Sequence, residues 1–236
     1  MMFAADYSTR NKVIEAFQKA SETALNVARI WAFDDEGLDF VIAKARKLGI
    51  YMILSLMNNW KDYGGKDKYT VLTRNNMITR VAYKDDPTIL AWELKNEPCC
   101  PSDPTGSNLQ ESRQQYNPNS NLDGTDFIAN NQIPDTGFAT SHLYPESWLP
   151  STNKTEGEQL AFVDKWIESY VLDSNAVLEK PIVISEFRKS YKLEGYSLDK
   201  RNKYFQKIYD DVYNSARLGG PFVGGLFWQL MTELRK

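Results

Sequence analysis

The order of apolar and polar positions predicts short strands that alternate with amphipathic helices. Residues 37–48 repeat apolar side chains at i, i+3, i+4 and i+7, the spacing of one helical face, and Gly49 supplies a stop. Similar spacing predicts helices over 8–23 and 200–217, another behind a capping box at 155–158, and a weaker one over 71–81. Short apolar runs predict six strands, at 25–33, 50–56, 89–94, 138–142, 181–186 and 223–230.

This alternation predicts a parallel sheet, because the helix between two strands carries the chain back to the same end of the sheet. A closed α/β barrel has eight strands, two more than the pattern supplies. The length of 236 residues suits one large domain or two small ones, and we expect a single domain over 1–236. Residues 99–124 sustain no apolar period and are rich in Pro, Gly, Ser, Asn and Gln, so we expect an irregular, insert-like loop there.

Composition narrows the classes of partner. The net charge is −3 with acids and bases interspersed, which argues against nucleic acid or an anionic membrane. No apolar stretch approaches the roughly 20 residues of a membrane span, and the N-terminus shows no signal-peptide pattern. Cys99 and Cys100 are adjacent and give no zinc pattern with the single histidine, so no metal is implied.

Two glutamates stand at the ends of separate apolar strands. The run 89–94, interrupted only by Glu93, reads as a buried strand that leads into Asn-Glu-Pro at 96–98, and Pro98 places Glu97 at its rim. Glu186 ends the run 181–186. Strands of one parallel sheet point their carboxyl ends the same way, and retaining glycosidases use two carboxyl groups about 5–5.5 Å apart. Either glutamate alone would more ordinarily be a solvated strand-end residue.

Around Asn-Glu-Pro, seven further blocks resemble the plant-type endo-β-1,4-mannanases of glycoside hydrolase family 5. In chain order they are 27–33, 54–59, 83–87, 125–131, 142–145, 186–190 and 225–230. The resemblance implies an α/β fold of the (β/α)8 TIM-barrel type, incomplete because the first and fifth strands appear absent. It also implies that residues 2–6 are the loop after the first strand. Shorter segments look missing between Asp34 and Gly37 and between Tyr69 and Thr70.

The resemblance also assigns the two catalytic carboxyl groups and a sugar contact. Glu97 matches the acid/base, Glu186 the nucleophile, and Asn96 the asparagine that binds the sugar 2-hydroxyl. The acid has to keep its proton until the glycosidic oxygen takes it, whereas the nucleophile has to stay ionised. These opposite needs call for different surroundings at the two glutamates.

Four other positions match substrate-site residues of the family, namely Arg29, His142, Tyr144 and Trp228. Arg29 would hold the nucleophile's carboxylate, the His-x-Tyr pair would tune the glutamates, and Trp228 would form a platform under the sugar. The alternatives are a strand-end ion pair for Arg29, a structural role for His142 and a core role for Trp228. Weaker candidates for sugar contacts are Trp31, Asn58, Trp60 and Trp148. Where the family usually has glycine after Glu-Phe, this chain has Arg188.

These residues predict endo-hydrolysis of β-1,4-mannosidic linkages in mannans, galactomannans and glucomannans by a double displacement. The alternatives are an inactive relative that at most binds polysaccharide and an unstable product of a damaged gene. Cellulase is the nearest enzymatic rival. No cofactor is implied, because carboxyl groups suffice for this chemistry. The resemblance implies a secreted, cell-wall enzyme.

Overall fold

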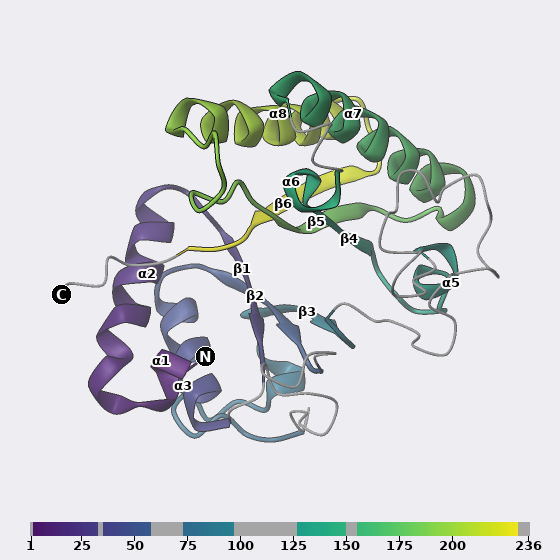
Figure 1. Ribbon diagram of the computed structural model, residues 1–236. Helices are drawn as coiled ribbons and strands as arrows, with labels where there is room; N and C mark the ends of the chain where they lie inside the picture. The colour runs from purple at the N-terminus through teal and green to yellow at the C-terminus, as the bar shows by residue number, and fades with distance from the viewer. Residues whose placement is uncertain (1, 33–34, 58–72, 97–126, 150–154, 231–236) are drawn as a thin grey trace, which may run out of the picture. The chain divides into compact units, whose positions relative to one another are not determined.

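The computed structural model describes residues 2–32, 35–57, 73–96, 127–149 and 155–230 (Figure 1). The chain forms two compact units, one of Met1–Pro98 with Leu230–Lys236 and one of Cys99–Gln229. The predicted loop at 99–124 lies outside the described residues, and the single-domain expectation stays a prediction. No helix among the described residues is long and apolar enough to cross a membrane.

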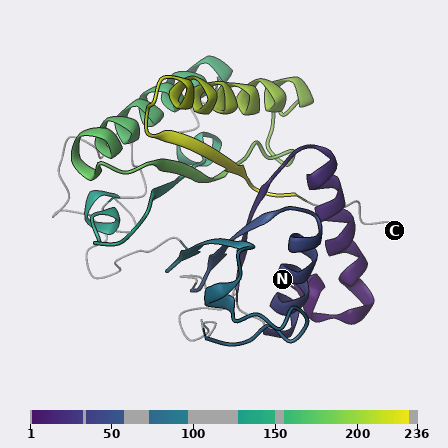
Figure 2. The same ribbon diagram turned by 180° about the vertical axis from the view of Figure 1, so that it is seen from behind.

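The first unit is built on a parallel sheet of β1 (Val27–Trp31), β2 (Tyr51–Ser55) and β3 (Ile89–Glu93), with β2 in the centre. Its helices are α1 (Met2–Ala5), η1 (Tyr7–Thr9), α2 (Arg10–Glu22), α3 (Asp35–Lys47) and η3 (Tyr83–Asp85). The apolar face predicted over 37–48 is the buried face of α3, comprising Leu38, Val41, Ile42 and Ala45. Figure 2 shows α2 and α3 side by side next to the sheet.

The helix predicted over 71–81 is wrong. Residues 73–82 form a turn closed by an antiparallel bridge between Asn75 and Ala82. The Asn76 side chain accepts hydrogen bonds from the backbone N–H of Ile78 at 2.9 Å and of Thr79 at 3.0 Å. A short amide side chain competes in this way with helical hydrogen bonds, and Arg80 adopts a positive φ of 62° that no helix contains.

Two further expectations for this unit need correction. Residues Met2–Ala5 form a short helix rather than a loop, because Ala4 is fully buried and its carbonyl accepts a hydrogen bond from Arg10 Nε at 2.8 Å. The strand over 89–94 is present, but it is not buried throughout. Leu90 is 55% exposed and Leu94 61% exposed, because among the described strands β3 is an end strand of its sheet and pairs with β2 alone.

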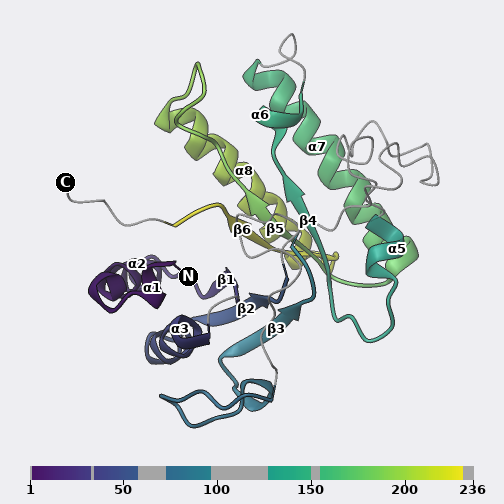
Figure 3. The same ribbon diagram turned by 60° about the horizontal axis from the view of Figure 1, so that its bottom comes forward.

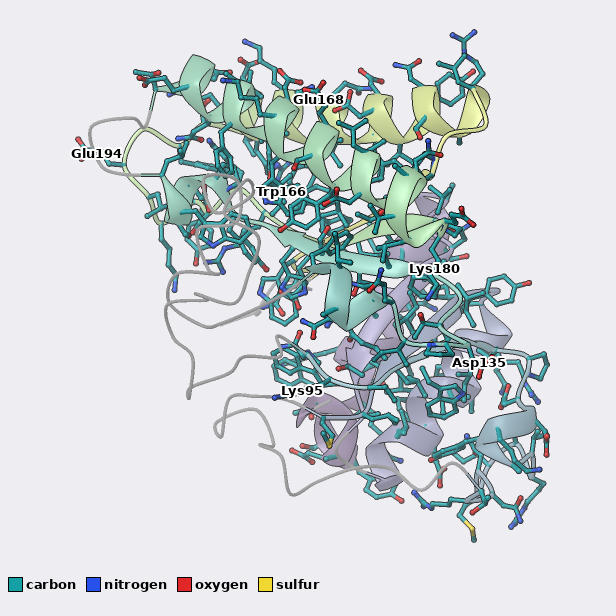
Figure 4. The ribbon with its side chains drawn as sticks, turned by 90° about the vertical axis from the view of Figure 1, so that its right-hand side faces the viewer. Lys95, Asp135, Trp166, Glu168, Lys180 and Glu194 are labelled. Carbon is teal, nitrogen blue, oxygen red and sulfur yellow. The ribbon has the colours of Figure 1, made fainter. Side chains whose placement is uncertain are left out.

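The second unit repeats the plan with a parallel sheet of β4 (Ala139–Leu143), β5 (Ile182–Phe187) and β6 (Phe222–Phe227), with β5 in the centre. Its helices are α5 (Phe127–Asn131), α6 (Pro145–Trp148), α7 (Glu156–Asp173), η6 (Ser174–Leu178) and α8 (Leu198–Arg217). Figure 3 shows α7 and α8 on one face of this sheet. In Figure 4, Trp166 points from α7 toward the sheet and Glu168 points away from it.

The predicted capping box begins α7. Thr155 accepts a hydrogen bond from the Glu158 backbone N–H at 3.3 Å, and the Glu158 carboxylate accepts one from the Thr155 backbone N–H at 3.2 Å. The apolar side chains of α7 that are buried are Val163, Trp166, Ile167 and Tyr170, and Leu160 on the same face is half-buried. The sequence pattern therefore predicted both the start and the buried face of this helix.

The six predicted strands are all present, in two sheets whose strands pair in chain order. This is the repeating plan of a (β/α)8 barrel, in which each parallel strand pairs with the next along the chain. The interval between β3 and β4, where the resemblance places an absent fifth strand, contains residues 97–126, which lie outside the described residues. The described residues thus form an incomplete (β/α)8 barrel, as expected.

Candidate active site

Arg29 lies on β1 and holds two polar partners near the carboxyl end of β3. Its Nε donates to Glu93 Oε2 at 2.9 Å, and its Nη2 lies 2.6 Å from the same oxygen. Nη2 also donates to Asn96 Oδ1 at 2.6 Å. The side chains of Arg29 and Glu93 are only 4% and 13% exposed. The attraction between their opposite charges compensates the free-energy cost of removing both groups from water. The predicted contact of Arg29 with a nucleophile stays a prediction.

Asn96 is 2% exposed and its amide orientation is set by Arg29. A guanidinium only donates hydrogen bonds, so the amide oxygen must face it and the Nδ2 group must face elsewhere. The Asn96 backbone N–H donates to the Met57 carbonyl at 2.8 Å, which fixes the residue to the end of β2. Among the described residues, the side-chain hydrogen bond of Asn96 is the one its Oδ1 accepts from Arg29.

Glu186 lies on β5 where that strand bulges against both neighbours. Pairing with β4 shifts between Ser141 and His142, and pairing with β6 shifts between Ile184 and Phe187. In each case β5 carries one more residue than its partner, and an extra residue of this kind redirects nearby side chains. Glu186 is 6% exposed, so its carboxyl group needs polar partners within the protein.

Those partners come from β4 and the residue that follows it. Tyr144 donates its hydroxyl to Glu186 Oε2 at 2.5 Å. His142 pairs with Glu186 in the sheet register, and its Nδ1 is 3.7 Å from the same oxygen. The two rings meet edge to face with centroids 6.2 Å apart. The structure therefore places two of the predicted site residues, His142 and Tyr144, around the buried carboxyl group of a third, Glu186.

Trp228 follows β6 and is tied to the residue after Glu186. Its backbone N–H donates to the Phe187 carbonyl at 2.7 Å, and the residue is half-buried. Phe187 is fully buried, and a Cβ at Gly225 would come within 3.2 Å of its ring. The glycine thus permits the close packing that supports this end of β5.

The second unit also contains a buried carboxylate that the sequence did not single out. Glu146 on α6 has a side chain that is 4% exposed and accepts hydrogen bonds from the Ser190 backbone N–H at 2.9 and 3.1 Å. Arg188 Nε lies 3.8 Å from its Oε1. Burial raises the pKa of the nearby Tyr204 hydroxyl well above its usual range, and the Glu146 charge adds to that rise. Tyr204 stays neutral and donates to the Leu143 carbonyl at 3.2 Å.

The remaining sequence candidates divide into two groups. Glu97, Asn58 and Trp60 lie outside the described residues. Trp148 packs its ring against Tyr144, Phe162 and Trp166, with centroids 5.9, 6.5 and 6.2 Å apart, which favours a structural role. Trp31 ends β1 and is half-buried.

Of the three contacting residues Arg29, Glu93 and Asn96, Glu93 is the one that the sequence analysis did not name as a functional candidate. Its signal was its place as the one charged residue within an apolar run, because a charge on such a strand requires a partner. Glu146 gave no comparable signal. It lies on a segment too short to show a period, and the cations near it follow more than forty residues later in the sequence.

Comparison with known proteins gives a consistent picture. The model of the family described as GH family 5 beta-mannosidase-like matches residues 66–235. Mannan endo-1,4-beta-mannosidase 1 of Arabidopsis thaliana is 40% identical over 313 residues, covering 99% of this chain and 76% of the relative. Mannan endo-1,4-beta-mannosidase 4 of Solanum lycopersicum is 40% identical, with 99% and 77% covered. Each alignment is longer than the 236 residues here, so the relatives contain internal segments that this chain lacks.

Solved structures show the same fold. The hyperthermostable endo-1,4-beta-D-mannanase of Thermotoga petrophila RKU-1 matches with a TM-score of 0.75 and 22% identity, over 96% of this chain and 85% of that one. The endo-1,4-beta-mannanase of Rhizomucor miehei matches with a TM-score of 0.71 and 23% identity, over 96% and 84%. These two likenesses concern the fold alone. The match to the family model and the 40% identity to the plant relatives show that the chain is a shortened member of the beta-mannosidase-like branch of glycoside hydrolase family 5.

Proposed function

We propose that this protein hydrolyses internal β-1,4-mannosidic linkages of mannans, galactomannans and glucomannans with retention of anomeric configuration. Support comes from the family and from relatives named as mannan endo-1,4-beta-mannosidases. One structural observation carries the proposal. The carboxyl group of Glu186 is buried and accepts a hydrogen bond from the Tyr144 hydroxyl at 2.5 Å. A carboxylate oriented by a neutral donor is a suitable nucleophile.

In the first step the Glu186 carboxylate attacks the anomeric carbon, and Glu97 gives its proton to the departing glycosidic oxygen. The C–O bond to the leaving sugar breaks as the ester bond to Glu186 forms. In the second step Glu97 removes a proton from water, the water oxygen attacks the same carbon, and the carboxylate of Glu186 leaves. Two inversions give net retention.

The binding roles follow from the available donors. Asn96 offers Nδ2 to the sugar 2-hydroxyl, because its oxygen is engaged by Arg29. Hydrogen bonds to that hydroxyl strengthen as positive charge develops at the anomeric centre. Trp228 supplies an apolar face for the sugar ring, and its backbone bond to Phe187 fixes it beside the strand of the nucleophile.

Hydrolysis of purified mannan and glucan substrates tests the proposal. We expect reducing ends to form from mannan and glucomannan, with much lower rates on cellulose derivatives. The variants E97Q and E186Q should each lower the rate by more than about a thousandfold, because each removes an essential carboxyl group. If the folded wild-type chain binds mannan without hydrolysing it, the proposed hydrolase is wrong and the protein is a polysaccharide-binding relative. We further propose secretion to the cell wall, which localisation of the tagged chain tests.

A further inference from the structure

Arg188 occupies an unusual place, two residues after Glu186 and directly after β5. Its Cζ lies 5.2 Å from the centroid of the Tyr144 ring, within the range of a cation–π contact. Its Nε lies 3.8 Å from Glu146 Oε1. Among the described residues its Nε donates no hydrogen bond, and the guanidinium lies near both the Tyr144 ring and the Glu146 carboxylate.

The carboxylate that faces Arg188 is itself fixed. Both oxygens of Glu146 accept from the Ser190 backbone N–H, and the side chain is 4% exposed. A buried anion held by a backbone donor still favours a nearby cation, and Arg188 supplies one. The arginine therefore has a rigid partner on one side and the face of an aromatic ring on the other.

The ring on which Arg188 lies is the one whose hydroxyl reaches Glu186. A phenol has no freedom between its ring and its oxygen, so the orientation of the ring sets the position of the hydroxyl. Sub-ångström positioning of this kind decides the rate of a catalytic step. The contacts thus form a continuous path from Glu146 through Arg188 and Tyr144 to Glu186.

We propose that Arg188 is a positioning residue that holds the Tyr144 ring so that its hydroxyl stays on Glu186. This role rests on the proposed function, in which Glu186 is the nucleophile. The resemblance places glycine at position 188, and glycine has no side chain that could hold the ring. The proposed positioning role is therefore specific to the arginine of this chain. The arginine acts through Tyr144 and touches no substrate.

The first test compares R188M, R188K and the control R201M on mannan. Arg201 also lies over an aromatic ring, 5.9 Å from the centroid of Phe205, and that ring packs on Phe187 and not on Tyr144. We expect R188M to lower kcat about tenfold with KM within about twofold, and R188K to stay within about threefold, since a lysine keeps the cation over the ring. R201M should leave both constants unchanged. A rise in KM at unchanged kcat would mean that Arg188 contacts substrate, which overturns the proposal.

The second test repeats R188M in a Y144F background. If Arg188 acts through the Tyr144 hydroxyl, its removal should lower kcat less than about twofold once that hydroxyl is gone. An unchanged tenfold loss in the Y144F background contradicts the proposal.

Crystallography can test the positioning role of Arg188 independently of the proposed hydrolase activity. Crystal structures of the wild-type protein and R188M should show the Tyr144 hydroxyl beyond hydrogen-bond distance of Glu186 in the variant alone. A wild-type protein that fails to hydrolyse mannan, with Tyr144 displaced in R188M, would end the proposed function and retain the positioning role. An unmoved Tyr144 in R188M overturns the positioning role whether or not the protein is active.

Discussion

Each unit has a three-stranded parallel sheet, but one sheet carries a buried cation and the other a buried carboxyl group. In the first unit a permanent cation, Arg29, is buried and neutralised by Glu93, with Asn96 as a further acceptor. In the second unit the carboxyl group of Glu186 is buried. It accepts a hydrogen bond from the Tyr144 hydroxyl and lies near His142 Nδ1. A buried ion pair depends on both partners being present, whereas a carboxylate held by a neutral donor keeps its own charge available for chemistry.

This difference predicts that the Arg29–Glu93 pair contributes mainly to stability and the Tyr144–Glu186 pair mainly to rate. The largest expected effect is that of R29M, which leaves Glu93 buried without its cation. We expect a loss of about 3 kcal/mol in the free energy of unfolding, measured by urea denaturation. The double variant R29M/E93M should recover most of that loss, because it removes both charges.

The matched control for this prediction is K19M. It breaks the exposed Lys19–Glu22 pair, whose side chains are 70% and 64% exposed. Exposed pairs contribute little, so we expect less than about 0.5 kcal/mol. Equal losses from R29M and K19M would show that burial gives the Arg29 pair no special weight, and the comparison of the two units would break down.

The next effect in size is that of Y144F on catalysis. Removing a hydrogen bond to a charged group costs about 1.5–3 kcal/mol, which corresponds to a loss of about 10- to 100-fold in kcat. The control is Y213F on α8, where the side chain is 67% exposed and lies on a helix behind the sheet. A Y144F enzyme with wild-type kcat and reduced stability would assign Tyr144 to the structure instead.

A smaller effect is expected at the start of α7. T155A removes the side-chain acceptor of the capping box and should lower the free energy of unfolding by about 1 kcal/mol. The wild-type kcat should persist in T155A, because α7 supports the sheet from behind. Thermal unfolding and mannan hydrolysis of the same sample check both statements, and a large loss of kcat would link the helix to the site.

The smallest effect concerns Lys207, which links α7 to α8 through Asp164 and also pairs with Asp211 at 3.1 Å. Burial disfavours its charged form, but the hydrogen bonds to both aspartates outweigh burial and raise its pKa above 10.5. A raised pKa in the folded state means that stabilisation is complete below the unfolded pKa and disappears as pH rises through the folded one. K207M should therefore cost under about 1 kcal/mol at pH 7 and progressively less above pH 10.5. A cost that grows with alkaline pH would contradict this.

The sequence predicted the scaffold well, because apolar spacing is a local property. All six strands and the buried face of α3 followed from it. It failed over 73–82, where the single side chain of Asn76 redirects the backbone. It also took β3 for a fully buried strand, because periodicity does not show whether a strand ends a sheet.

The site was predictable in its members but not in their partners. Glu186, His142 and Tyr144 were chosen by resemblance, and the structure brings them together. The link between Arg29 and Glu93 spans 64 positions, and that between Arg188 and Glu146 spans 42, so no local pattern encodes either. Such pairings appear only when the strands are placed in register.

Covalent trapping tests the central claim, that Glu186 is the nucleophile and is held by Tyr144. The chain would be incubated with an activated 2-deoxy-2-fluoro-mannoside, and the intact mass and labelled peptide would be measured. We predict one sugar per chain, attached to Glu186, with slower labelling in Y144F and none in E186Q. A folded protein that stays unlabelled, or that carries the sugar on another carboxyl group, would contradict the account.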